Sequence, residues 1–137
     1  MNRISLTEMA RRIATSLNIE SIIASEEQIE EQIKSYPALW IKPAEIIEGS
    51  LTTGGRVCSE LCLTLLIEAS HNRYTNQADL SEKGLTLLLG IARELAQEDE
   101  ILLIENPESS IETKAFTAHT ALAVGLTVEI TTREDIN

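Results

Sequence analysis

The chain has 137 residues, 43% of them hydrophobic and 24% charged, which predicts one folded domain over residues 1–137. Asp and Glu outnumber Lys and Arg by 22 to 11, and the net charge of −11 argues against binding to nucleic-acid phosphates or anionic membranes. No apolar run approaches the roughly 18 residues of a membrane span, and residues 1–7 lack the apolar run of a signal peptide, so we expect assembly in the cytoplasm.

Two helices are expected at the start of the chain. Ser5 and Glu8 have the spacing of a capping box, and apolar residues recur behind them at helical spacing, which predicts a helix over residues 5–17. Residues 25–28 repeat the capping pattern and predict a second helix. Pro37 ends that helix, because the residue before a proline avoids the helical backbone.

Strand patterns follow the helices. Apolar runs predict short strands at residues 38–42 and 44–48, and Pro43 makes the first of them a short or edge strand. Residues 56–69 alternate between apolar and polar side chains, which predicts a long strand with one face on the core. The polar residues 70–78 predict a loop.

The C-terminal half predicts a helix and two further strands. The helix is expected over residues 79–97, and a short strand over residues 101–104 ends at a turn formed by residues 106–107. Residues 115–132 alternate strictly and predict a second long strand. Because this strand is longer than a small domain needs, we expect a bulge or bend at Gly125, or a division into two strands.

Together these elements predict an α+β fold, with a mostly antiparallel sheet of about four to five strands and with the N-terminal helix and one long helix packed on it.

No phosphate-binding loop, nucleophile motif or metal-ligand spacing is present. Cys58 and Cys62 share a strand face but are too far apart to bond, so we interpret them as buried free thiols. We therefore expect no catalytic residue, cofactor or metal. The alternative of a small enzyme would use Cys58, Cys62 or His119.

The order and spacing of the elements resemble the tail-terminator proteins of long-tailed bacteriophages, especially those of Mu-like phages and prophages. The resemblance covers nearly the whole chain. It rests on the helix over residues 5–17, the strand VCSELCLTLLI (57–67), the helix over residues 80–96, the segment IENP (104–107) and the closing strand ending LTVEITT (126–132).

The resemblance implies a structural virion protein with no catalytic residues. Such proteins form a ring, usually a hexamer, that caps the head-proximal end of the tail tube. The implied partners are further copies of the chain, the tube protein, the sheath protein in a contractile tail, and the head-completion or connector protein. DNA would pass through the ring without specific binding. The implied location is the tail-neck region of the virion, after assembly in the host cytoplasm.

The interface residues have to be predicted without a family motif. The polar segments at residues 49–55 and 70–78 are the expected docking loops, because loops carry function on a rigid scaffold. Two arginines of the first helix lie off its apolar stripe, on a solvated face or in contact with an acidic neighbour. The predicted subunit and tail interface comprises Arg11, Arg12, Ser50, Thr52, Thr53, Arg56, His71, Asn72, Arg73 and Tyr74.

Two other functions remain open. The chain fits a head-completion or connector (neck) subunit of similar size. It also fits a small ligand-binding or protein-binding adaptor domain.

Overall fold

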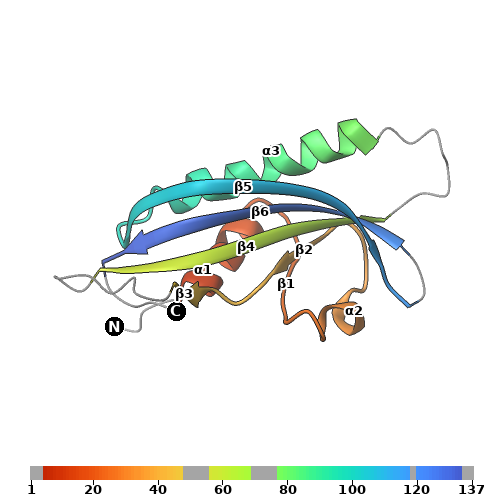
Figure 1. Cartoon of the computed structure of the whole chain (residues 1–137), viewed down its shortest axis with the longest axis horizontal. Helices are drawn as coiled ribbons and strands as arrows, with labels where there is room; N and C mark the ends of the chain where they lie inside the picture. Colours follow the sequence, from red (N-terminus) through yellow and green to blue (C-terminus); the bar gives the residue numbers. More distant parts are fainter. Residues whose placement is uncertain (1–4, 48–55, 69–76, 118–119, 134–137) are drawn as a thin grey trace.

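The computed structural model describes residues 5–47, 56–68, 77–117 and 120–133, and it has the α+β fold expected from the sequence (Figure 1). The elements in chain order are α1 (Leu6–Ser16), β1 (Ser21–Ile23), α2 (Ile29–Gln32), β2 (Ala38–Ile41), β3 (Glu45–Ile46), β4 (Val57–Glu68), α3 (Gln77–Leu95), β5 (Ile101–Ala115) and β6 (Thr120–Thr132).

The strands form one sheet in the order β1-β2-β4-β6-β5, and β3 pairs with β4 beside this path. β1 runs parallel to β2, while the other described pairs are antiparallel. The expected mostly antiparallel sheet is therefore confirmed. It has six strands rather than four to five, because β1 was not expected.

The hydrophobic core lies between the sheet and the two longer helices. Leu61 and Leu63 of β4 stand opposite Val128 and Leu126 of β6, and all four side chains are buried on the face that α1 and α3 cover. Burial of such side chains contributes roughly 1.5–3 kcal/mol each, so this alternating pattern on two long strands supplies much of the folding free energy. Figure 1 shows α3 running along β5 and β6.

The expected first helix is confirmed as α1. The Ser5 hydroxyl accepts a hydrogen bond from the Glu8 backbone N–H at 3.1 Å, as a capping box requires. Its apolar residues are buried against the sheet and α3.

The second expected helix is largely wrong. Only Ile29–Gln32 is helical, and a strand, Ser21–Ile23, precedes it. Ser25 makes a turn in which its carbonyl accepts hydrogen bonds from the N–H groups of Gln28 and Ile29. The helix ends well before Pro37, because Ile33 already has an extended backbone with ψ of 119°.

The turn expected at residues 106–107 is also wrong. Asn106 adopts a left-handed backbone with φ of 52°, and the register of β5 shifts between Glu105 and Glu108. These residues form a bulge, which absorbs the proline while the strand continues to Ala115. The expected short strand at residues 101–104 is therefore the first part of a 15-residue strand.

The closing strand expected at residues 115–132 is shorter than expected: β6 is a single strand over Thr120–Thr132, and Ala115 is the last residue of β5. The bulge or bend expected at Gly125 is wrong, because Gly125 lies within a regular ladder, opposite Thr64 and Ser110. Phe116 packs against the cluster around Trp40, on the sheet face away from α1 and α3. The expected strand before Pro43 is short, but it is an interior strand between β1 and β4.

The two glycines of α3 offer a matched test of how closely this helix lies on the sheet. A Cβ at Gly84 would stand 3.3 Å from the Cβ of Val124 on β6, whereas a Cβ at Gly90 meets no described atom within 4 Å. We predict that Gly90→Ala raises the free energy of unfolding by about 1 kcal/mol through helix propensity. Gly84→Ala should lower it, because the Val124 Cβ is fixed to a central strand. Urea denaturation of both variants is the measurement, and equal stabilisation by the two substitutions would contradict this packing.

Candidate assembly surface

The sheet ends in free edges on both sides. β5 pairs with β6 and with no other described strand, and on the opposite side β1 pairs only with β2 and β3 only with β4 among the described strands. An unpaired edge presents N–H and C=O groups that invite pairing with another chain. The two edges are therefore candidate surfaces for assembly.

The edge formed by β5 is long and exposed. The strand has 15 residues and spans about 50 Å, and the side chains of residues 105–113 are all exposed. Ile111 is 57% exposed, an unusual position for an isoleucine. Residues 108–115 pair with β6 without a register shift, so beyond the bulge this edge is regular and offers a template for another strand.

Glutamates line the sheet face that α1 and α3 leave uncovered. In lateral register across four strands, Glu45 stands opposite Glu60, Glu60 opposite Glu129 and Glu129 opposite Glu105. Asn106 Nδ2 donates a hydrogen bond to Glu129 Oε2 at 2.5 Å. Like charges directly opposite each other destabilise a sheet, although water screens those that are exposed. This row repels phosphate groups and favours a cationic partner.

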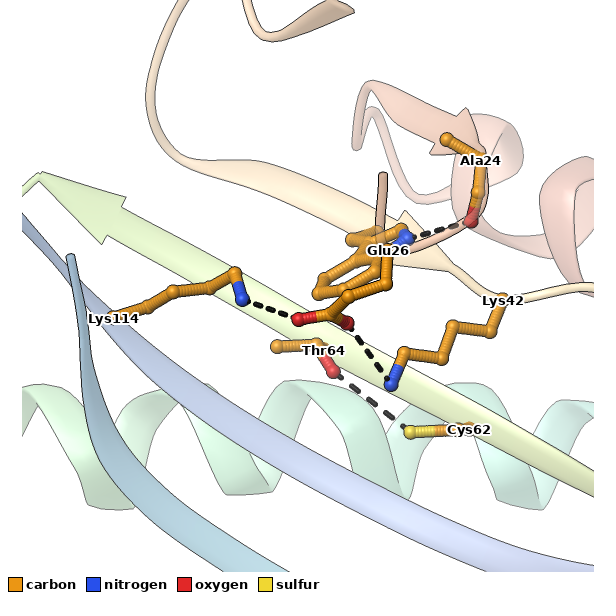
Figure 2. Close-up of polar contacts among 7 residues, drawn as sticks. Ala24, Glu26, Lys42, Cys62, Thr64 and Lys114 are labelled. Atoms are coloured by element: carbon orange, nitrogen blue, oxygen red, sulfur yellow. Dashed lines mark hydrogen bonds and ion pairs between the residues drawn. The ribbon is translucent and has the colours of Figure 1, made fainter. Parts of the chain in front are cut away.

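Trp40 lies at the other end of the same face, on β2 opposite Thr64. Figure 2 shows the polar contacts that surround this part of the sheet, with Glu26, Lys42 and Lys114 labelled. The side chain of Trp40 is buried, and its Nε1 donates a hydrogen bond to the carbonyl of Ala24 at 2.8 Å. The ammonium groups of Lys42 and Lys114 lie 4.8 Å and 5.5 Å from the centre of its ring, and Lys114 also lies 5.6 Å from the ring of Phe116. Such cation–π contacts attract the lysines to this apolar site.

A carboxylate bridges the two lysines. Figure 2 shows Glu26 between them, with its oxygens 2.5 Å from Lys114 Nζ and 3.4 Å from Lys42 Nζ. The hydrogen bond from Lys114 holds the pKa of Glu26 below its ordinary value, and partial burial opposes this effect. Through Glu26, the segment between β1 and α2 is thus held against Lys42, which directly follows β2, and against Lys114 of β5.

A second carboxylate fastens α2 to the end of β5. Glu30 accepts hydrogen bonds from the backbone N–H and the hydroxyl of Thr117, the latter at 2.9 Å. Burial, and then the nearby charges of Glu68 and Glu30, raise the pKa of Tyr36 on the same segment. Glu26 and Glu30 together close this end of the sheet face with residues from the N-terminal part of the chain.

Three of the predicted interface residues lie in the described part of the chain. Arg11 and Arg12 are exposed on α1, where Arg11 pairs with Glu8 at 3.2 Å. Arg56 is exposed immediately before β4. None of these three arginines belongs to β5, the edge strand beside β6. The predicted residues outside the described part are Ser50, Thr52, Thr53, His71, Asn72, Arg73 and Tyr74.

Cys58 and Cys62 are free, as expected, but they are half-buried on the acidic face rather than fully buried. Within residues 5–47, 56–68, 77–117 and 120–133, no group of three or more His, Cys, Asp or Glu side chains is arranged to hold a metal ion. None of the described helices is long and apolar enough to span a membrane.

The chain was compared with protein-family models and with curated proteins, and neither comparison gives a match.

The sequence did not predict that the residues of β5 form an exposed strand edge. Residues 105–114 are mostly polar and include the Asn106-Pro107 pair, which is typical of a loop. The signal for a strand was weak but present, because Ile111 and Thr113 are β-branched residues spaced by two. Strand propensity alone does not show that the outer edge stays unpaired.

The bridge formed by Glu26 predicts a pH-dependent contribution to stability. Because the pKa of Glu26 is lower in the folded chain than its ordinary value of 4.5, ionisation favours the folded state. This contribution is fully present above about pH 4.5, and it is lost as the pH falls through the folded-state pKa. We therefore expect Glu26→Gln to be less stable than the parent at pH 7, with the difference shrinking in acid.

The measurement is denaturant unfolding of both proteins between pH 7 and pH 3. Glu27→Gln removes the same charge from an exposed neighbouring residue and is the matched control. A stability difference for Glu26→Gln that is independent of pH, or equal to that of Glu27→Gln, would show that the bridge does not contribute.

Proposed function

We propose that this chain is a tail-terminator subunit of a long-tailed bacteriophage. Copies of it form a ring that caps the tail tube, contacts the sheath if the tail contracts, and receives the head-completion or connector protein. The resemblance in the order and spacing of the elements suggests this function. The observation that carries it is the long exposed edge of β5, on a sheet whose α1–α3 face is already filled.

The fold supports a structural role for three reasons. A rigid scaffold is provided by α1 and α3 on one face of the sheet. Free edges on both sides can join neighbouring copies, and a cyclic contact between two different surfaces closes into a ring. A ring stops the growth of a tube when one of its sides matches the tube end and the other does not.

The charge distribution suits a passage for DNA. The glutamate row across β3, β4, β6 and β5 repels phosphates, and the whole chain carries a net charge of −11. A ring that turned this face toward its lumen would let DNA slide without binding to it.

Deleting the gene from the phage tests the proposal. We expect tails of excessive and variable length, because nothing then halts tube polymerisation, and negative-stain electron microscopy measures this directly. Expression of the parent chain in trans should restore a single length.

Tails of normal length that lack heads would contradict a terminator and identify a head-completion or connector subunit instead. Normal, fully assembled virions would exclude both and favour the adaptor alternative.

A further inference from the structure

We infer that copies of this chain join head to tail, with the β5 edge of one copy seated against the α1 side of the next. We call the first surface the acidic edge (Glu105, Glu108, Ile111 and Glu112 of β5) and the second the arginine side (Arg11, Arg12, Leu17 and the outer edge of β1). This inference rests on the proposed ring, because a closed ring needs two different surfaces that fit each other.

Exposed apolar side chains mark both surfaces. In the described part of the chain, the large hydrophobic side chains that remain exposed are those of Leu17, Ile46, Leu103 and Ile111. Leu103 and Ile111 lie on β5, while Leu17 ends α1 and Ile46 lies on β3, on the opposite side of the sheet. Contact between Ile111 of one copy and Leu17 of the next would remove both side chains from water, which is the main driving force of association.

The charges of the two surfaces are opposite. Glu105, Glu108 and Glu112 are exposed along the acidic edge. On the arginine side, Arg12 is exposed and makes no ion pair with any described residue, while Arg11 pairs with Glu8. Seating the glutamates against these arginines gives Arg12 a partner, and such complementarity fixes register and suppresses wrong contacts.

The arginine side has room for a neighbouring strand. An open hollow of about 420 Å³ lies beside β1 at the C-terminal end of α1. The side chain of Arg11 and the first residue of β1, Ser21, both line this hollow, together with the carboxylate-bearing residue Glu20. The lining residues are Arg11, Thr15, Asn18, Ile19, Glu20 and Ser21.

A two-fold contact between two β5 strands fits these charges less well. It would bring the glutamates of both copies to one seam, and like charges across strands are destabilising. It would also leave Arg12 and Leu17 exposed. An isologous contact of this kind closes on itself as a dimer and cannot extend into a ring.

Two variants, each damaged on one surface, test the direction of assembly. Glu108→Lys with Glu112→Lys alters the acidic edge, and Arg12→Ala with Leu17→Ser alters the arginine side while leaving the Arg11–Glu8 pair in place, so the two altered surfaces do not carry opposite charges at these positions. We expect the parent chain to form species larger than a dimer at concentrations up to about 1 mM, and each variant alone to associate at least about tenfold more weakly. Sedimentation velocity measures the species present.

Mixing the two variants gives the decisive result. Each retains one intact surface, so the mixture should form a one-to-one heterodimer and nothing larger. Glu82→Lys with Lys83→Glu on α3 is the matched control, since both residues are exposed and belong to neither surface, and it should assemble like the parent. Circular dichroism confirms that each variant is folded.

Two outcomes would overturn the inference. One is a parent chain that stays monomeric over the whole concentration range. The other is an arginine-side variant that dimerises alone, which indicates a two-fold β5 contact. These results are independent of tail length: head-to-tail assembly with normal tails in the deletion mutant would refute the terminator function alone, and overlong tails without head-to-tail assembly would refute this interface alone.

Discussion

All 12 positions of β4 pair with β6, and this register decides which side chains reach the helices. It aligns the odd-numbered residues of β4 with the even-numbered residues of β6 on the face covered by α1 and α3. A slip of β4 by one residue would turn Glu60 toward the core and Leu61 toward water. The position of every other element follows from this pair.

The chain has enough helix to cover only one face of its sheet. On the other face, a short N-terminal segment covers the end around Trp40, where Ile29 packs in a second apolar cluster and two carboxylates hold the segment in place. Toward the other end of that face, the glutamate row and the half-buried cysteines remain uncovered. Polar residues on this face are the consequence of its exposure to water, and its acidity selects against phosphate-bearing partners.

The edges of the sheet provide the proposed means of assembly. Natural sheets usually protect a free edge with a lysine, a proline or a bulge. In β5, Pro107 and the bulge protect the first half of the strand, whereas residues 108–115 continue as a regular ladder with Ile111 exposed, and the lysine of this stretch, Lys114, is engaged by Glu26 and Trp40 on the sheet face. A chain that assembles through an edge needs such an unprotected stretch. The glutamates beside it provide selectivity, because they disfavour pairing with an identical edge.

The sequence by itself determined the elements whose signals are local. The capping box of α1, the alternation of β4 and the period of α3 each depend on neighbours within a few residues, and each element was predicted close to its observed bounds. Only the tertiary structure decided the rest. Ser21–Ile23 became a strand because β2 is available to pair with it, and Asn106 became part of a bulge because β6 continues alongside. The candidate surface depends on the tertiary structure for the same reason: whether an edge is free is set by which strands lie next to it, and that information is spread over the whole chain.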